Sequence, residues 1–253
     1  MPRLAILGAT GSLGSHVARI AVDKGYDTSV LVRSADRLAP DVRARVRILE
    51  ADIRDMPSGA LAAFLDGHDV MISCAGLVTE GPRFVDLFDR VVSEVEVMAP
   101  GARPVCWFLA GAGLLDLDAT GRRGLDFPPL KDTYWPHGVN HERLQRSDLD
   151  WRLLCPGPMV DQPPVGAERL RMSVDRLPTP MPDGVEALAP DALLPLFAAR
   201  IPEMIIPYAD AAAFMLSHAA PGSDLRRKRV GLALPVGLRG HKEQWTAQVK
   251  PPR

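Results

Sequence analysis

The amino-acid sequence predicts an α/β fold in which a doubly wound parallel sheet carries helices on both faces. Short, nearly continuous apolar runs alternate with helical segments, a pattern typical of strands that are buried on both faces and joined by right-handed crossovers. The composition indicates a globular protein, since 47% of the 253 residues are hydrophobic and 24% are charged. The net charge of −1 offers no broad attraction to nucleic acid or to an anionic membrane.

Six apolar runs predict the strands of the sheet, and helical segments lie between them. The strands are expected at residues 3–7, 27–32, 46–49, 69–74, 105–109 and 151–155. The helices are expected at residues 13–24, 57–65, 82–98 and 139–146. Two of these helices begin at a proline, which is favoured at the first helical position. Because ligands bind beyond the carboxyl ends of parallel strands, the residues after each run are the candidates for a site.

A proline-rich segment follows the sixth strand. Nine prolines fall within residues 156–195, and they exclude long regular elements there. Short strands are expected near residues 169–174, 204–207 and 229–234, with a helix at residues 209–218. We interpret the chain as a single domain, residues 1–253, with a core at about 1–157. The remainder, about 158–253, is interpreted as a substrate-side extension over the ligand edge of the sheet.

Three glycines follow the first strand and open the first helix, in the run GATGSLG from residue 8 to residue 14. This spacing in this context is the fingerprint of a Rossmann-like dinucleotide site. Gly8 would make the tight turn, Gly11 would let the backbone approach a pyrophosphate, and Gly14 would let helix and strand pack. The helix N–H groups would face the anion, so the expected cofactor contacts also include Thr10, Ser12 and Leu13.

The end of the second strand favours NADP(H) over NAD(H). An NAD site places an acid about 20 residues after the glycines to bind the ribose 2′-hydroxyl. Here Arg33 and Ser34 stand at that place, and the first acid is Asp36. The guanidinium fork of Arg33 matches a 2′-phosphate, with Ser34 or Arg37 as helpers. A solvated loop arginine is the alternative, because exposure is the usual state of arginine.

Further motifs at the strand ends give the chain a family resemblance. They are LVRS, ADIRD, SCAG, FLAGAGLLD and HERLQRSDLDWRLLCPGPM. Together with GATGSLG they resemble the atypical short-chain dehydrogenase/reductases, in the NAD(P)H-binding branch that includes flavin reductase, biliverdin reductase B and NmrA-like proteins. The resemblance implies that Asp52 and Ile53 flank the adenine, although Asp52 could equally be a turn residue. It also implies contacts to the adenosine ribose from Ala75 and Gly76, and to the nicotinamide end from Leu109, Ala110, Gly111, Pro156, Gly157 and Met159.

The usual catalytic pair of this superfamily is absent from the sequence. A tyrosine acid needs a lysine four residues later on the same helical face, but the three tyrosines are followed at that distance by Val30, Gly138 and Ala212. Hydride transfer to a flavin, quinone or similar ring needs no side-chain acid, since the cofactor supplies the chemistry. Gly111 and Gly113 would leave room for such a ring, although both could be ordinary turn glycines.

A histidine on the helix before the sixth strand is the expected proton donor. His141 is the preferred candidate, because it falls on this helix, where the resemblance places active-site groups. An imidazole can titrate near neutral pH, as a general acid needs. His137 and Tyr134 are the other candidates, with Gly138 expected to separate His137 from the helix. A structural or solvated histidine is the alternative.

These observations together predict an NADPH-dependent reductase of a small, planar acceptor. The alternative is a catalytically silent NADP(H)-binding regulator that senses redox state. The acceptor pocket is expected from residues 160–200, which match no motif. No metal site is expected, because the three cysteines have no metal-ligand spacing. The sequence shows no signal-like segment and no long apolar stretch, so we expect a cytoplasmic monomer or weak homodimer whose partner is the small-molecule acceptor, with no membrane or nucleic-acid partner.

Overall fold

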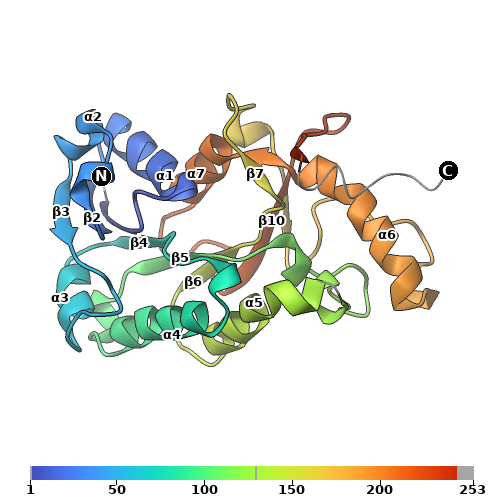
Figure 1. The fold of residues 1–253 in the computed structure, drawn as a ribbon, viewed down its shortest axis with the longest axis horizontal. Helices are drawn as coiled ribbons and strands as arrows, with labels where there is room; N and C mark the ends of the chain where they lie inside the picture. The colour runs from blue at the N-terminus through green and yellow to red at the C-terminus, as the bar shows by residue number, and fades with distance from the viewer. Residues whose placement is uncertain (1, 129, 244–253) are drawn as a thin grey trace.

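The computed structural model describes residues 2–128 and 130–243, which form one mostly parallel sheet with helices on both faces (Figure 1). The eight strands follow the order β3-β2-β1-β4-β5-β6-β10-β8, and only β8 runs antiparallel to its neighbour. They are β1 (Arg3–Leu7), β2 (Asp27–Val32), β3 (Arg47–Glu50), β4 (Val70–Ser73), β5 (Val105–Leu109), β6 (Trp151–Leu154), β8 (Arg171–Val174) and β10 (Lys228–Ala233). The predicted doubly wound parallel sheet is therefore confirmed.

The strand order reverses at β1, and this reversal sets the position of the site. The chain runs from β1 outward to β3 and then returns to β4 on the other side of β1. Leu7, the last residue of β1, pairs with Leu31 of β2 and with Ser73 of β4. The carboxyl ends of these three strands thus share one edge of the sheet, which is where a doubly wound fold binds its ligand.

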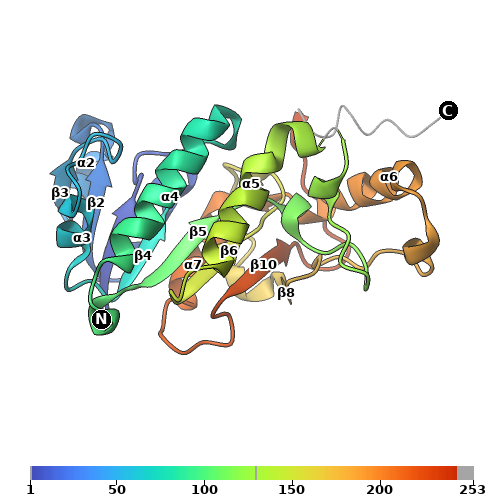
Figure 2. The same cartoon turned by 90° about the horizontal axis from the view of Figure 1, so that it is seen from below.

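Helices cover the two faces of the sheet in separate layers (Figure 2). On one face lie α1 (Ser12–Asp23) and α7 (Tyr208–Ser217), which pack against each other. On the other face lie α3 (Ala60–Leu65), α4 (Pro82–Glu96) and α5 (Leu130–Gln145). Two short or outlying helices complete the set, α2 (Pro40–Arg43) near β2 and α6 (Pro190–Arg200) beyond β10. Each layer buries its own apolar cluster against the sheet.

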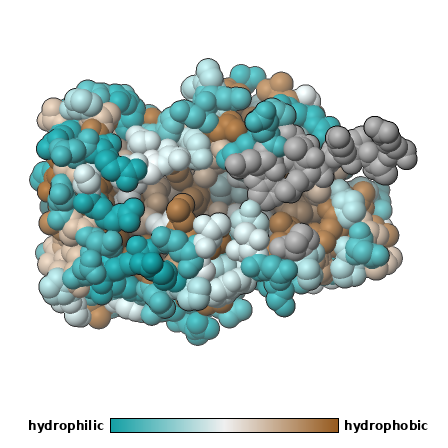
Figure 3. Space-filling view, in the orientation of Figure 1, coloured by the Kyte–Doolittle hydropathy of each residue, from teal (hydrophilic) through white to brown (hydrophobic). Residues whose placement is uncertain are grey.

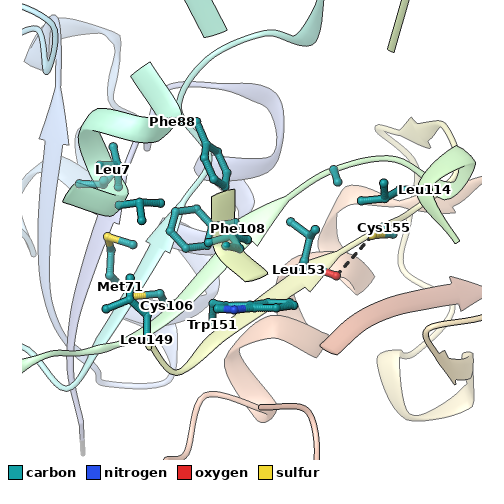
Figure 4. Packing of buried hydrophobic residues seen from close by; sticks show 14 of the residues in the cluster. Leu7, Met71, Phe88, Cys106, Phe108, Leu114, Leu149, Trp151, Leu153 and Cys155 are labelled. Atoms are coloured by element: carbon teal, nitrogen blue, oxygen red, sulfur yellow. Dashed lines mark hydrogen bonds between the residues drawn. The ribbon is translucent and has the colours of Figure 1, made fainter. Parts of the chain in front are cut away.

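The α4 helix shows how sequence pattern positions a layer. Pro82 begins this helix after Gly81, whose φ of 58° suits glycine. Phe84, Phe88 and Val91 are buried at helical spacing along it. Figure 4 shows Phe88 above Phe108 of β5, and the two ring centroids lie 4.7 Å apart. Below them the cluster continues through Met71, Cys106 and Trp151.

Three helix predictions need correction. The helix expected at 57–65 begins only at Ala60, because Gly59 adopts a left-handed conformation before it. The helix expected at 139–146 begins at Leu130, so Pro136 and Gly138 lie inside it rather than before it. The expected lack of long elements among the prolines is wrong, because α6 is an 11-residue helix. Pro190 lies at its start, where no N–H partner is needed, and Pro195 is exposed, so water can satisfy the carbonyl that loses its partner.

The proline-rich extension shares its sheet with the core. β10 adds to the free edge of β6 in parallel, and β8 then adds to β10 in antiparallel orientation. A second, two-stranded sheet joins β7 (Met159–Val160) to β9 (Ile206–Pro207). Of the elements expected after residue 160, the three strands and the helix are all present, with β9 shorter than predicted. In residues 2–128 and 130–243 no helix is long and apolar enough to cross a membrane.

Candidate cofactor and acceptor site

The glycine turn after β1 is held by contacts that only glycine allows. Gly8 has a φ of +82°, and a Cβ there would lie 3.0 Å from the Cys74 carbonyl group. A Cβ at Gly14 would lie 2.2 Å from the Gly8 oxygen, so the absence of this atom lets α1 pack on the strand end. A Cβ at Gly11 would meet only the Gly8 oxygen, at 3.5 Å, and faces open space otherwise. Gly11 is thus the glycine whose backbone a ligand can approach.

A cavity of about 280 Å³, the glycine cleft, lies at the carboxyl ends of β1 to β4. It is lined by nine of the residues predicted to contact the cofactor: Gly8, Thr10, Gly11, Ser12, Arg33, Asp52, Ile53, Ala75 and Gly76. The start of α1 opens into it, where the first N–H groups of a helix have no partner within the helix. These features fit the pyrophosphate and adenosine of a dinucleotide.

Three predicted contacts do not line the glycine cleft. The Leu13 side chain is 4% exposed and packs in the core, so only its backbone could reach a ligand. Gly14 lies against Gly8 and serves the packing of helix on strand. Ser34 precedes a 3₁₀ turn and is absent from the lining, whereas Arg37 at the end of that turn is part of it.

Two arginines give the glycine cleft a positive rim. The guanidinium groups of Arg33 and Arg37 make no hydrogen bond or ion pair in the described part of the chain. Asp52 lies across the cleft, and its Oδ1 accepts a hydrogen bond of 2.9 Å from the Arg54 N–H. Asp52 is therefore a turn residue that also lines the cleft. Sequence reasoning missed the ion pair of 2.6 Å between Arg54 and Glu80, which closes one side of it.

A second cavity of about 320 Å³, the aromatic pocket, adjoins the glycine cleft. Both cavities share the segment of residues 74–77 that follows β4. All six residues predicted for the nicotinamide end line the pocket, namely Leu109, Ala110, Gly111, Pro156, Gly157 and Met159. Its remaining walls are largely hydrophobic, with Phe84, Phe88, Phe108, Leu125, Phe197 and Ile201. Figure 3 shows hydrophobic side chains in a hollow in the middle of this face, between hydrophilic margins.

Residues 160–200, from which the acceptor pocket was expected, contribute little to the aromatic pocket. Of residues 160–200 only Phe197, on α6, lines it. The other walls come from α4, from the segment around Leu125 and from the start of α5. Sequence reasoning missed Phe84 and Phe88 because their spacing on α4 equally suits a core position, and both residues are indeed mostly buried.

His137 lies in the wall of the aromatic pocket beside the end of β5. Its Cδ2 and Nε2 atoms are 3.6 Å from the position of a Cβ at Gly111. The side chain is 8% exposed, and its Nδ1 has no hydrogen-bond partner in the described part of the chain. The ring stands at 89° to Phe84, with the centroids 5.9 Å apart, and is parallel to Tyr134 at 6.3 Å. Burial lowers the pKa of His137 to about 4, so the imidazole is neutral at pH 7.

His141, the preferred candidate for the proton donor, does not line either cavity. The structure therefore does not place it where it could act on an acceptor there. It is 6% exposed and stands edge-on to Trp151, with the ring centroids 5.9 Å apart. It follows His137 by one helical turn, about 6 Å further from the strand ends. Burial and then the charge of Arg229 lower its pKa to about 4, so neither histidine titrates near neutral pH. Tyr134 lines the aromatic pocket, and burial raises the pKa of its phenol.

No site for a metal ion is found among the described residues. No group of three or more His, Cys, Asp or Glu side chains in residues 2–128 and 130–243 could hold one. Cys74 lines both cavities, and burial raises the pKa of its thiol to about 12. This cysteine is therefore a neutral thiol at pH 7. The two cavities together fit a dinucleotide beside a largely apolar pocket.

The chain is similar to several proteins of this architecture. The structure of SP1627 from Streptococcus pneumoniae TIGR4, named "a putative NADH-flavin reductase", covers 92% of this chain and 100% of its own with a TM-score of 0.69 and 19% identity. A short-chain dehydrogenase/reductase from Veillonella parvula DSM 2008 in complex with NADP covers 94% and 97% with a TM-score of 0.63 and 16% identity. At these identities the likeness shows the fold.

Sequence comparison adds the family. YwnB of Bacillus subtilis (strain 168) is 24% identical over 165 residues, which are 63% of this chain and 73% of YwnB. A sequence profile described as NAD(P)H-binding matches residues 8–179, which is more than half of the chain and includes the glycine turn, strands β2 to β6 and the start of the extension. The chain therefore belongs to the NAD(P)H-binding family.

Proposed function

We propose that this protein is an oxidoreductase that binds NADPH in the glycine cleft and reduces a small, planar acceptor in the aromatic pocket. The observation that carries the proposal is the junction of the two cavities at residues 74–77. A dinucleotide whose pyrophosphate lies at the start of α1 would extend along this segment toward Gly111 and His137. The names of the similar proteins, which include a flavin reductase and a short-chain dehydrogenase/reductase, agree with this class of reaction.

A preference for NADPH over NADH is supported by the charges around the glycine cleft. Arg33 and Arg37 line it at the end of β2, where a ribose 2′-phosphate would be bound. Neither guanidinium forms an ion pair with an acid of the described chain, so both are available to donate hydrogen bonds to a phosphate. The three residues that follow β2 are Arg33, Ser34 and Ala35, so no acid directly follows this strand.

The protein's part in the reaction is alignment, exclusion of water and one hydrogen bond. When bound, the cofactor supplies the hydride. The ring of His137, fixed between Phe84 and Tyr134, can donate a hydrogen bond to an oxygen or nitrogen of the acceptor. Because this imidazole is neutral at pH 7, it polarises the acceptor as a donor, and solvent supplies the proton. This arrangement needs no tyrosine and lysine pair.

The alternative function is a silent NADP(H)-binding regulator. A measurement of NADPH turnover distinguishes it from the proposed reductase. The experiment follows NADPH absorbance with stoichiometric and catalytic amounts of protein, against riboflavin, a naphthoquinone and an aldehyde. We expect oxidation of NADPH with at least one ring acceptor and a kcat lowered about tenfold or more in His137→Gln, with NADPH affinity unchanged. The matched control is His68→Gln, since His68 bonds Ser29 away from both cavities. If the protein binds NADPH but never oxidises it, the reductase proposal is wrong and the regulator takes its place.

A further inference from the structure

The aromatic pocket holds almost no charge, and this narrows the chemistry of its ligand. Its polar side chains are Ser73, Tyr134, His137 and Lys242, besides the Cys74 thiol. No arginine and no carboxylate of residues 2–128 and 130–243 lines it. Burial keeps the imidazole and the phenol neutral, since it lowers the pKa of the histidine and raises that of the tyrosine.

Among the residues that the structure describes, one cationic side chain, Lys242, lines the pocket. The Nζ of Lys242 donates a hydrogen bond of 2.8 Å to the carbonyl oxygen of Met159, at the start of β7. The lysine is thus hydrogen-bonded to the backbone at β7. Phe84 and Phe88 of α4 also line the pocket and stand edge to face with their ring centroids 6.4 Å apart.

The contrast with the glycine cleft is sharp. That cavity carries Arg33, Arg37 and the open start of α1, all suited to phosphate groups. In the described part of the chain, the aromatic pocket offers ring faces for stacking and one ammonium group, that of Lys242, in place of two arginines and a helix start. An anionic group taken into it would lose its hydration without gaining a matching set of charges, which is costly.

We infer that the acceptor is an uncharged, hydrophobic aromatic compound and that the pocket discriminates against anionic acceptors of the same ring system; this inference rests on the proposed reductase function. For a naphthoquinone, NADPH gives a hydride to the ring, the quinone is reduced by two electrons, and one proton from solvent completes the hydroquinone while NADP⁺ is released. The same reasoning places riboflavin above its phosphorylated form as a substrate.

Two matched compound pairs test the inference on the unmodified protein. The first is 1,4-naphthoquinone against 1,4-naphthoquinone-2-sulfonate, and the second is riboflavin against riboflavin 5′-phosphate, with NADPH saturating. We expect kcat/KM to favour the uncharged member of each pair by about tenfold. A ratio above threefold in both pairs supports the inference, and a smaller ratio in either pair overturns it. If no acceptor oxidises NADPH, the proposed function itself fails.

A binding measurement without turnover gives an independent readout. Calorimetric titration of each naphthoquinone into the protein saturated with NADP⁺ should show tighter binding of the uncharged compound by a similar factor. Equal affinities would overturn the inference even if the rates differ.

A charge-introducing variant tests the physical cause. Leu77 lines both cavities where they meet and is 66% exposed, so Leu77→Arg should fold normally. The assay keeps NADPH saturating, so that a change in cofactor affinity does not enter the comparison of the two quinones. We expect this variant to improve the use of the sulfonate relative to the parent quinone by at least threefold. The matched control is Val97→Arg, an exposed apolar position outside both cavities, which should leave the ratio unchanged. Equal effects of the two variants would contradict a role of local charge.

Discussion

The imidazole of His137 lies against Gly111, 3.6 Å from the point where a Cβ would stand. This contact joins α5 to the end of β5 at the place where the aromatic pocket would receive the reacting rings. Because residue 111 is glycine, no side chain stands in front of the Cδ2 and Nε2 atoms of this imidazole. The next larger side chains should therefore affect the pocket before they affect the fold.

Substitution of Gly111 should separate binding from stability. Its φ is −140°, an extended conformation open to any residue, so Gly111→Ala should change the free energy of unfolding by less than about 1 kcal/mol. Gly111→Val should fill the space before His137 and lower kcat/KM for the acceptor by about tenfold or more. Thermal unfolding and steady-state kinetics check both. Gly101→Val, in open space, is the control, and equal kinetic losses in both valine variants would refute the assignment.

Arg33→Ala should reverse the cofactor preference. Removal of one charge-assisted pair with a 2′-phosphate should weaken NADPH binding by about tenfold or more and leave NADH binding unchanged. Arg37→Ala should have a smaller effect in the same direction. Equilibrium fluorescence titration with both cofactors measures the ratio of affinities. Arg146→Ala, an exposed arginine outside the glycine cleft, is the control. An unchanged ratio in Arg33→Ala would remove this residue as the determinant.

Gly14→Ala should destabilise the fold itself. The added methyl group would lie 2.2 Å from the Gly8 oxygen, so α1 has to move away from the strand end. We expect a loss of about 3 kcal/mol in the free energy of unfolding, in the range of overpacked core positions. Urea unfolding measures it, with Gly101→Ala as the unstrained control. A loss no greater than that of the control would show that the strand and helix can separate at little cost.

The two buried histidines should make stability fall in mild acid. Each has a folded-state pKa of about 4, below the ordinary histidine pKa of 6.5. The unfolded chain therefore binds protons between pH 6.5 and 4 that the folded chain does not, and stability declines as the pH falls through this window. The slope should reach about 1.4 kcal/mol per pH unit for each histidine.

Urea unfolding at pH 7, 5.5 and 4.5 checks this slope. The double variant His137→Gln/His141→Gln should show a flatter dependence than the unmodified protein, since glutamine does not titrate. An identical pH dependence in both proteins would mean that other groups cause the acid sensitivity.

The glycine cleft could be predicted from the sequence because its signals are local. Gly8, Gly11 and Gly14 act through backbone geometry within one turn. Strands such as β1 and β2 coincide with the short apolar runs that predicted them. The aromatic pocket could not be predicted in the same way. Phe197 and Phe84 belong to helices far apart in the chain, and only the packed sheet shows that they share a cavity.

The choice between His137 and His141 depended on where α5 begins. The two residues are four positions apart and lie on the same face of the helix, so periodicity cannot separate them. The sequence pattern predicted a helix only from residue 139, with Gly138 separating His137 from it, and so His141 was the histidine placed on the helix. With the start at Leu130, the earlier histidine is the one near the strand ends. The sequence pattern did not indicate that α5 continues through Pro136.

The place of β10 in the sheet has a consequence for the order of folding. β8 leaves the synthesising machinery some 55 residues before β10, yet β10 is its only neighbour among the described strands of the sheet. Strands β1 to β6 can pair as they emerge, whereas β8 has no hydrogen-bonding partner until the last strand has arrived. Nascent chains that stop before Lys228 should thus possess the nucleotide half of the sheet while residues 171–174 remain unpaired. Maturation of the molecule proceeds from the glycine turn outward, and its far edge closes last.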